Sequence, residues 1–265
     1  MDTFKGKVVW ITGASSGIGE ALAAAFAKEE AILVLSSRRK EELERVKKAC
    51  GLNDMRCLIL PFDLADTSGV QTLTEQVIKQ FGRIDVLVNN GGMSQRSFVK
   101  DTPLEIDRKF MEINYFGTIA VTKAVLPYML KEKSGHIVVI SSISGKFGYF
   151  LRSAYSASKH ALHGFFESLR MEVANDHIDV TLICPGKIRT NISINALNGK
   201  GEKHNKMDKL SAEGLSAEAC ATHVLKSVKD REVETFVGGR ELRAIWIKRF
   251  FPKFFFKGIL KQKAE

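Results

Sequence analysis

The stretch Val8-Val9-Trp10-Ile11-Thr12-Gly13-Ala14-Ser15-Ser16-Gly17-Ile18-Gly19 decides the fold of this chain. Its apolar run, Val8 to Ile11, is typical of a buried parallel strand, and the run ends at a glycine-rich turn. A helical pattern follows from Glu20 to Lys28. Because such a turn presents free backbone N–H groups and the positive end of a helix, it is suited to bind a pyrophosphate. The stretch therefore predicts the first strand, turn and helix of an α/β sheet.

Further apolar runs alternate with helical patterns along the rest of the chain. Strands are expected at Ile32–Ser36, Met55–Pro61, Ile84–Val88, His136–Ser141, Val180–Ile183 and Thr235–Val237. Helices are expected at Thr67–Phe81 with Thr67 or Ser68 as cap, from Asp101 to Lys131, from Tyr155 to Asn175, and at Ala217–Lys229 with Ser216 as cap. The expected fold class is a single α/β domain with a Rossmann-like, doubly wound sheet of about seven parallel strands. Ligands are expected at the carboxyl ends of the strands.

The stretch Tyr155-Ser156-Ala157-Ser158-Lys159 places a phenol and an ammonium four residues apart, on one face of a helix. An ammonium close to a phenol favours the phenolate, so the pair can exchange a proton with a carbonyl oxygen at ordinary pH. The plainer interpretation of an isolated pair is a Tyr and a Lys on a half-buried helix face. Three other features argue against it: the glycine-rich turn, the run Asn89-Asn90-Gly91-Gly92 after a strand, and Ser142 at the end of another.

Taken together, these motifs resemble the short-chain dehydrogenase/reductase family in its classical form, from about Lys5 to about Gly239. The glycine spacing is TGxxxGxG, as in that family, rather than GxGxxG. Residues 89–97 and 155–162 look most like the branch called dehydrogenase/reductase member seven. Gly91 departs from the family pattern, which usually has Ala. This departure loosens the backbone beside the cofactor but removes no chemical group.

The end of the second expected strand bears on the choice of cofactor. In sheets of this kind an acidic residue at this position binds the ribose 2′-hydroxyl and selects NAD. This chain has Ser37 and then Arg38, so a 2′-phosphate would meet a guanidinium instead of a carboxylate. NADP(H) is therefore the expected cofactor. Arg39 also has a plainer interpretation, as the start of a charged helix.

The resemblance implies further cofactor contacts. Asp63 would accept a hydrogen bond from the adenine amino group, and Leu64 would pack beside the ring. The Asn89-Asn90 pair would bridge neighbouring strands and the cofactor ribose, while Ile188 and Thr190 would contact the carboxamide end. The expected cofactor-binding residues are Gly13, Ser15, Ser16, Gly17, Ile18, Gly19, Arg38, Arg39, Asp63, Leu64, Asn90, Gly91, Tyr155, Lys159, Pro185, Gly186, Ile188 and Thr190.

By the same resemblance, the catalytic set is Asn114, Ser142, Tyr155 and Lys159. Tyr155 would give a proton to a carbonyl oxygen that receives a hydride at its carbon, and Ser142 would hydrogen-bond that oxygen. Lys159 would favour the phenolate and bind the nicotinamide ribose. Asn114 would hold a water that links Lys159 to solvent. The alternative for Asn114 is a structural bond from its side chain to the backbone, and both can hold.

The expected substrate is a lipophilic ketone or aldehyde, steroid-, retinoid- or lipid-like, and its alcohol. An apolar pocket would form from Met93, Phe147, Tyr149, Phe150 and a lid at 191–216. The expected substrate-binding residues are Ser142, Ser144, Met93, Phe147, Tyr149 and Tyr155. The alternative function is a non-catalytic NADP-binding redox sensor or scaffold of the same fold. The intact Ser–Tyr–Lys set argues against that alternative.

Composition supports a soluble globular enzyme: the 265 residues are 45% hydrophobic and 26% charged. The four cysteines have no metal-type or redox-type spacing, which favours free thiols in a reduced, cytoplasmic compartment. His160 and His163 have no acidic or cysteine company in the sequence, so we expect both to be structural and expect no metal. The polar start, Met1 to Lys7, predicts neither a signal peptide nor a spanning helix before the first strand.

The net charge of +10 is concentrated at the C-terminus, where residues 240–265 hold eight Lys or Arg and two Glu. The rest of the chain has no nucleic-acid motif, so no nucleic-acid partner is expected. Residues 1–239 would form the catalytic domain and 240–265 a basic, aromatic tail. Lys253, Lys257 and Lys261, among aromatic residues after Pro252, suit a helix in a membrane interface. Alternatively, that apolar face packs over the pocket or on a second subunit. The resemblance implies a homodimer or homotetramer in either case.

Overall fold

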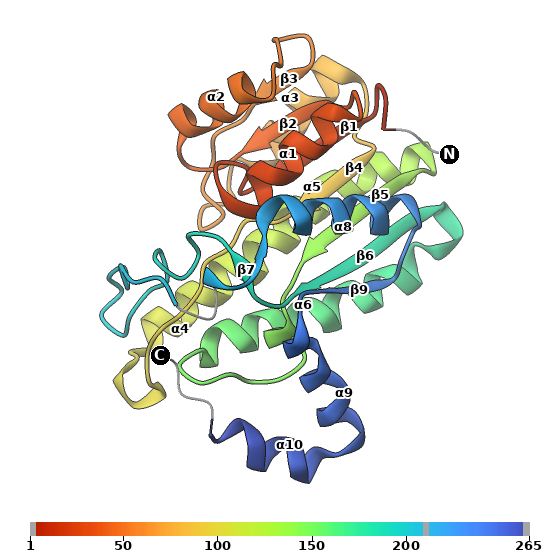
Figure 1. Ribbon diagram of the computed structural model, residues 1–265. Coiled ribbons are helices and arrows are strands. Elements are labelled where there is room, and N and C mark those ends of the chain that lie inside the picture. The colour runs from red at the N-terminus through yellow and green to blue at the C-terminus, as the bar shows by residue number, and fades with distance from the viewer. Residues whose placement is uncertain (1–3, 209–211, 262–265) are drawn as a thin grey trace.

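The computed structural model describes residues 4–208 and 212–261 and contains a parallel seven-stranded sheet between two layers of helices (Figure 1). The strands are β1 Val8–Thr12, β2 Ile32–Ser36, β3 Cys57–Ile59, β4 Val86–Asn89, β5 Gly135–Ile140, β6 Ile178–Pro185 and β9 Glu234–Val237. Their order is β3-β2-β1-β4-β5-β6-β9. The order reverses beside β1, so the carboxyl ends of β1 and β4 flank the crevice where doubly wound sheets bind ligands. The expected fold class is confirmed.

Two helical layers cover the sheet. The helices are α1 Gly17–Lys28, α2 Lys40–Ala49, α3 Val70–Phe81, α4 Leu104–Met111, α5 Gly117–Glu132, α6 Ser153–Glu172, α8 Ala217–Lys229, α9 Arg243–Phe250 and α10 Pro252–Ile259. Buried side chains of α1, α2 and α8 form one core with the sheet, and those of α3, α5 and α6 form the other. Among the described residues, no helix is both long enough and apolar enough to cross a bilayer.

The first strand shows how the sequence supplies both cores. Successive side chains of a strand point to opposite faces of the sheet. Val9 and Ile11 accordingly belong to the core under α1 and α8, whereas Val8 and Trp10 belong to the core under α5 and α6. The indole N–H of buried Trp10 donates to Ser36 Oγ at 2.8 Å, so its polar group is satisfied. A strand buried on both sides therefore reads as a continuous apolar run.

Several expected boundaries differ from the observed ones. The third strand is shorter than Met55–Pro61, because Met55 lies in a turn and is 78% exposed. The cap expected for α3 at Thr67 or Ser68 is wrong. That helix begins after Gly69, without a side-chain cap, and Ser68 Oγ donates to Asp66 Oδ1 at 2.7 Å instead. Short polar side chains near a helix start readily make such local turn bonds.

The single helix expected from Asp101 to Lys131 is interrupted. It begins at Leu104, and a π-helical turn at Glu112–Phe116 separates α4 from α5. Asn114 lies inside this turn and is fully buried. Its side chain is held by groups from outside the helix, described below, and a π turn is a common way to aim one side chain out of the regular ladder. The helix α6, which holds Tyr155 and Lys159, also ends earlier than expected, at Glu172, and a 3₁₀ turn follows at Ala174–Asp176.

The close approach of α1 to the β1 turn gives a test of the fold. A Cβ at Gly19 would lie 2.3 Å from Gly13 O and 2.5 Å from Asn90 Nδ2. We expect Gly19→Ala to lower the free energy of unfolding by about 1–3 kcal/mol, as overpacking does. Urea denaturation measures the change. Gly164→Ala is the matched control: this α6 position is open, so the change should stabilise by about 0.5–1 kcal/mol. Equal effects of the two changes would contradict the close approach.

Candidate active site

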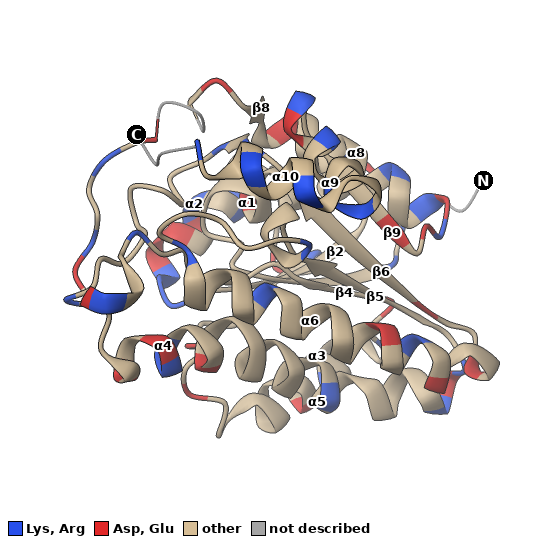
Figure 2. Ribbon diagram, turned by 90° about the horizontal axis from the view of Figure 1, so that it is seen from below, with Lys and Arg blue, Asp and Glu red and all other residues tan. Residues whose placement is uncertain are grey.

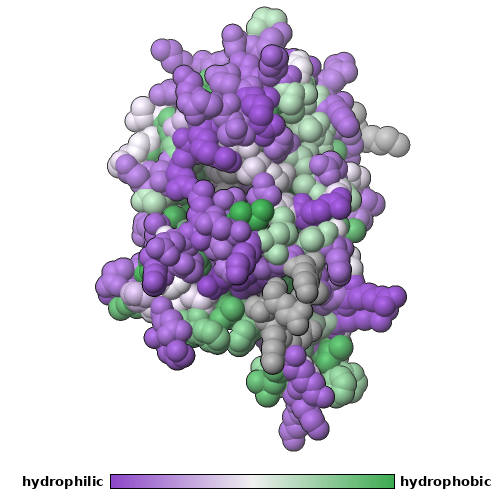
Figure 3. Space-filling view, turned by 60° about the vertical axis from the view of Figure 1, so that its left-hand side comes forward, coloured by the Kyte–Doolittle hydropathy of each residue, from purple (hydrophilic) through white to green (hydrophobic). Residues whose placement is uncertain are grey.

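The sequence motifs meet at the carboxyl edge of the sheet. The glycine-rich turn follows β1, the Asn89–Gly92 run ends β4, Ser142 follows β5, and Pro185 ends β6. Figure 3 shows a recess in the side of the molecule on which these strand ends open, bordered mainly by hydrophilic residues. Residues separated by more than a hundred positions are thus neighbours here.

The glycine-rich turn is held in place by the end of β4. Gly13 and Gly17 adopt positive φ angles of 64° and 60°, which glycine accepts without strain. Asn90 Nδ2 donates to Thr12 O at 3.0 Å and to Gly13 O at 3.2 Å. The bridge expected from Asn90 between neighbouring strand ends is therefore present. Asn89 differs from that expectation, since its amide donates to Thr122 Oγ1 of α5 at 2.9 Å.

The structure explains the glycine at position 91, where the family usually has alanine. A Cβ at Gly91 would lie 2.4 Å from Leu64 Cδ1, so Leu64 fills the space that a methyl group would need. A Cβ at Gly17 would lie 3.2 Å from Thr190 Cγ2. Leu64 and Thr190, expected cofactor contacts from distant loops, therefore both reach the β1–β4 crevice.

Two arginines lie at the end of β2 beside the glycine-rich turn. Arg39 Nη2 donates to Oγ of buried Ser15 at 3.1 Å. Arg38 is 70% exposed, with its Nη1 3.9 Å from Asp63 Oδ2. An exposed ion pair of this length contributes little to stability, about 0–1 kcal/mol. The Arg38 guanidinium is therefore available to an anionic ligand.

Lys159 is buried next to Tyr155. Its Nζ donates to Ile140 O at 2.8 Å and lies 6.0 Å from the centroid of the Tyr155 ring. Burial lowers the pKa of Lys159 to about 8. A Cβ at Gly92 would lie 3.0 Å from Asn114 Oδ1 and 3.8 Å from Lys159 Nζ. A side chain at position 92 would therefore be tight against the Asn114 amide and in contact with the Lys159 ammonium.

The structural alternative for Asn114 is present. Its Oδ1 accepts from Met93 N at 2.8 Å, and its Nδ2 donates to Met93 O at 3.1 Å and to Ser158 Oγ at 3.0 Å. These bonds tie the π turn to the loop after β4 and to α6. Ser158 Oγ in turn donates to Tyr155 O at 2.8 Å. Asn114 thus fixes the relative positions of three segments of the site.

Ser142 lies at the start of the loop after β5. Its Oγ accepts from Ser144 N at 3.1 Å, while its contact with Pro185 O is long, at 3.5 Å. The hydroxyl therefore keeps most of its donor capacity for a ligand. Ser144 is buried, and its backbone N–H orients Ser142.

The expected pocket residues have unequal surroundings. Met93 packs against Phe110, Ala154 and Leu197. The ring of Phe147 instead packs edge to face on the ring of Phe255, with 5.2 Å between the two ring centroids. Leu197 belongs to the segment expected as a lid, which is partly ordered by bridges of Leu197 with Gln95 and Lys203. The short strands β7 Ile188–Arg189 and β8 Leu215–Ser216 pair at the two ends of that segment.

Sequence reasoning missed four residues beside Tyr155. Gln95 Oε1 accepts from Tyr155 N at 3.2 Å, and Arg96, Arg152 and Asp208 form an ion-pair cluster. Arg152 stands three positions before Tyr155, so its proximity could have been inferred from the sequence. Asp208 lies in an irregular segment and has no pattern that predicts its partners.

The expectation that His163 has no acidic or cysteine company is wrong. Cys184 Sγ lies 3.7 Å from His163 Nε2, and Glu234 Oε1 lies 3.5 Å from Nδ1. These types of side chain can bind a metal ion. Burial lowers the pKa of His163 to about 3 and raises the pKa of the Cys184 thiol, so both groups are neutral. Lys146 already pairs with Glu234, and His163 Nε2 lies 3.0 Å from Ser141 Oγ. We assign the cluster to packing below the Ser141 turn.

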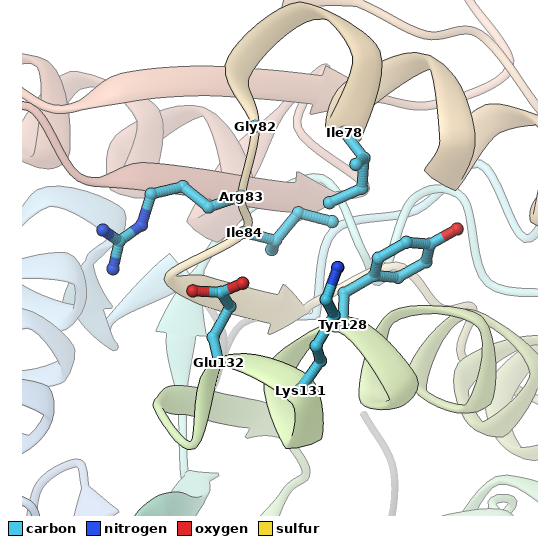
Figure 4. Close-up of a pocket in the computed structure, with 7 residues that line it drawn as sticks. All are labelled: Ile78, Gly82, Arg83, Ile84, Tyr128, Lys131 and Glu132. Atoms are coloured by element: carbon cyan, nitrogen blue, oxygen red, sulfur yellow. The ribbon is translucent and has the colours of Figure 1, made fainter.

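Two depressions lie away from the strand carboxyl ends. Figure 4 shows one of about 120 Å³, where Tyr128 and Glu132 of α5 lie opposite Ile78 and Ile84. The other, about 580 Å³, opens at the amino ends of β4 and β5. Because neither contains a motif residue, we assign neither to catalysis.

Comparison with known proteins agrees with this geometry. The family model described as short chain dehydrogenase matches residues 7–200. The Dehydrogenase/reductase SDR family protein 7-like of Anopheles gambiae is 46% identical, over 98% of this chain and 84% of its own length. The human Dehydrogenase/reductase SDR family member 7 is 45% identical, over 91% of this chain and 69% of its own length.

Solved structures show the same fold. A short-chain dehydrogenase/reductase from Burkholderia phymatum, in complex with NAD, superposes with a TM-score of 0.85 at 22% identity, covering 100% of this chain and 98% of its own. A short-chain dehydrogenase from Streptomyces avermitilis superposes with a TM-score of 0.83 at 28% identity, covering 97% and 98%. With the family model and these relatives, the chain belongs to the short-chain dehydrogenase/reductase family of oxidoreductases.

Proposed function

We propose that this protein is an NADP(H)-dependent oxidoreductase that interconverts a lipophilic carbonyl compound and its alcohol. The observation that carries the proposal is the position of Tyr155 beside the buried ammonium of Lys159, at the strand ends that also present Ser142. Polar groups gathered at the carboxyl ends of a doubly wound sheet are positioned for a ligand. A purely structural role would not require a lysine to be buried with one backbone partner.

Each side chain has a distinct part in the proposed reaction. The nicotinamide ring, when bound, supplies or accepts the hydride. Tyr155 protonates the carbonyl oxygen during reduction, and Ser142 donates a hydrogen bond to that oxygen as its negative charge develops. The ammonium of Lys159 favours the phenolate and binds the nicotinamide ribose. Asn114 would hold a water that links Lys159 to solvent and so returns the proton.

The cofactor proposal follows from the crevice between β1 and β4. Gly13, Gly17 and Gly19 bring backbone N–H groups and the start of α1 to the pyrophosphate. In this proposal Asp63 and Leu64 would face the adenine end, and the segment Pro185–Thr190 would cover the nicotinamide end; the support is that Leu64 lies against Gly91 and Thr190 against Gly17. Arg38 and Arg39 supply positive charge where the ribose 2′-phosphate would lie. This charge is the argument for NADP(H) over NAD(H).

A lipophilic substrate suits the apolar side chains around the site. We propose that Met93, Phe147 and Tyr149 border it and that residues 191–216, of which 209–211 lie outside the described residues, close over it as a lid. A non-catalytic redox sensor of the same fold is the alternative. It would bind NADP(H) but would not oxidise it in the presence of any carbonyl. The weakly engaged hydroxyl of buried Ser142, whose contact with Pro185 O is 3.5 Å long, favours catalysis, because a sensor needs no group directed at a carbonyl oxygen.

We also propose that the protein forms a homodimer or homotetramer through its long helices. Phe116, between α4 and α5, is 47% exposed, and Met171 on α6 is 71% exposed. Large apolar residues on neighbouring helices are typical of a covered interface.

The C-terminal helices form a second exposed surface, and we propose that it attaches peripherally to a membrane. Trp246, Phe250, Phe251, Phe254 and Phe256 are each more than half exposed. Figure 2 shows Lys and Arg residues on α9 and α10, which carry no Asp or Glu. Aromatic residues among lysines suit the boundary of an anionic bilayer.

One contact of the tail supports the alternative expectation. The ring of Phe255 packs on Phe147 of the expected pocket, so α10 is anchored through one residue and exposes its other aromatic residues. The basic face is smaller than expected, since α10 ends at Ile259 and includes only Lys253 and Lys257. Lys261 lies beyond the helix.

Cofactor choice gives the first test of the proposed function. Arg38→Ala should weaken NADPH binding about ten- to a hundredfold, because a charge-assisted phosphate contact contributes about 1.5–3 kcal/mol. NADH binding should stay nearly unchanged. Fluorescence titration with both cofactors measures the effect, and Arg45→Ala, at an exposed residue of α2 paired with Glu20, is the control. Equal binding of both cofactors by the unaltered protein would refute the NADP(H) preference.

The proton donor gives the second test. Tyr155→Phe should keep the fold and NADPH binding but lose nearly all turnover, because only the hydroxyl is removed. Lys159→Ala should lose turnover and part of the cofactor affinity, since the ammonium serves both. NADPH oxidation with a panel of carbonyl compounds, together with cofactor titration, separates the two roles. Retention of a tenth or more of the rate by Tyr155→Phe would assign the proton to another group.

Membrane attachment gives the third test. The full chain should sediment with anionic phosphatidylserine vesicles at low salt and less with neutral vesicles. Phe250→Ser with Phe254→Ser should lower the partition coefficient at least tenfold, because each buried ring contributes about 1.5–3 kcal/mol. Met55→Ser with Val99→Ser, which removes exposed apolar residues elsewhere, is the control. A chain lacking residues 244–265 is the second comparison. If the unaltered chain binds anionic vesicles at low salt no better than this shortened chain, the tail is a packing element.

A further inference from the structure

A cluster of three charged side chains lies beside Tyr155 and has no part in the proposed proton transfer. Arg96 comes from the loop after β4, Arg152 precedes α6, and Asp208 belongs to the segment between β7 and β8. Arg96 Nε donates to Asp208 Oδ1 at 3.2 Å, and Arg96 Nη2 donates to Oδ2. Arg152 Nη2 donates to the same Oδ2 at 3.1 Å. One carboxylate thus faces two guanidinium groups, and the three side chains together keep one positive charge.

This surplus charge is largely buried. The side chains of Arg96, Asp208 and Arg152 are 4%, 11% and 22% exposed. Burial lowers the pKa of Arg152, and the Arg96 guanidinium lowers it further. Within the described part of the chain, Arg152 Nε is buried and donates to no acceptor. Because an unsatisfied buried donor is costly, this N–H is a position where an acceptor would be favourable.

The cluster belongs to the substrate side of the site. The Arg152 guanidinium lies 5.0 Å from the centroid of the Tyr149 ring, an expected pocket residue. Tyr155 is close enough for its charge to act on Arg152. Gln95, next to Arg96 in the chain, accepts the Tyr155 backbone N–H. A group bound at Arg152 would therefore lie near the reacting carbonyl and away from the β1–β4 crevice.

We propose that Arg152, supported by Arg96, binds an anionic group of the carbonyl substrate, a carboxylate or a phosphate. The inference rests on the proposed function, because it assigns the substrate class of that same site. Nε and Nη2 lie on one edge of a guanidinium and match two oxygens of an oxyanion. On Arg152 the Asp208 carboxylate occupies Nη2 alone, so an incoming oxyanion completes the edge. The substrate is then an amphiphile, with an apolar body against Met93 and Tyr149 and an anionic group at Arg152.

The competing interpretation is an ion latch, in which Asp208 only fastens the segment between β7 and β8 to the catalytic helix. The two interpretations predict opposite results for Asp208→Asn. For an anion site, this change removes a competing carboxylate and should strengthen binding of anionic substrates. For a latch, it removes the fastening and should weaken turnover of charged and uncharged substrates alike.

The experiment compares matched substrates in NADPH oxidation. The pairs are 4-benzoylbutanoate with its methyl ester and phenacyl phosphate with 2-hydroxyacetophenone. The unaltered protein should show at least a tenfold higher kcat/KM for one of the anions, mostly through KM, and the preferred pair distinguishes carboxylate from phosphate. Arg152→Met should abolish the preference for the anion, while kcat/KM for the uncharged member of the pair stays within about twofold of that of the unaltered protein. Arg152→Lys should restore part of the preference. Arg170→Met, at an exposed position of the same helix, should preserve it.

Two results would overturn the proposal: equal kcat/KM for both members of each pair, or an equal loss for both members in Arg152→Met. A binding measurement separates this inference from the proposed function. Calorimetric titration of the NADP⁺-loaded protein with 4-benzoylbutanoate and phenacyl phosphate should show binding that Arg152→Met weakens at least tenfold and Asp208→Asn strengthens. If no carbonyl is reduced but this pattern is seen, the redox function fails and the anion site stands. If carbonyls are reduced and the pattern is absent, the anion site fails alone.

Discussion

The burial of the Lys159 ammonium is the constraint on which the arrangement of this site depends. Removing a charge from water costs several kcal/mol unless other groups compensate, and Ile140 O is the hydrogen-bond acceptor that the described chain supplies. Burial accordingly lowers the Lys159 pKa to about 8, so a growing fraction is neutral above that pH. A protein accepts such a cost where a ligand later compensates it. The ribose hydroxyls and the Tyr155 phenol are the groups that would do so.

Two requirements explain the residues around Lys159: space must remain for the Asn114 amide, and the loops beside Lys159 must be held in position. Gly92 has no side chain because a Cβ would meet Asn114, and the π turn at Asn114 exists where its amide spans Met93 and Ser158. On the cofactor side, Asn90 performs the same task by joining β4 to the turn after β1. Both asparagines use side-chain amide bonds to fix loops that have no ladder of their own, Asn114 through its oxygen and nitrogen and Asn90 through its nitrogen. The strand ends of the site are therefore joined by side-chain amide bonds.

Those outer segments are tied to the site by few, specific contacts. Asp208 joins the segment between β7 and β8 to two arginines, and Phe255 joins the C-terminal helices to Phe147. Glu241 Oε1 accepts from Lys187 N at 2.8 Å, so the start of the tail also contacts the segment after β6. A change in the tail would thus be transmitted to the loops after β5 and β6, because its contacts reach Phe147 and Lys187.

The sequence alone predicts those strands and helix caps whose pattern of apolar or capping residues lies within a few neighbouring positions. Val8–Thr12 and Ile32–Ser36 read as strands because they are buried on both faces, and Ser216 caps α8 through its own Oγ. The motif spacing likewise identified the family and the residues that meet at the strand ends.

Only the tertiary structure decided which distant groups share a space. Leu64 fills the place of a methyl at Gly91, Cys184 and Glu234 lie beside His163, and Asp208 faces Arg96 and Arg152. None of these pairings has a periodic or short-range signature, because each joins loops or strands that the sheet order brings together. The sequence specified the local elements through backbone and burial periodicity, whereas contacts between non-adjacent segments depend on the packing of the whole sheet.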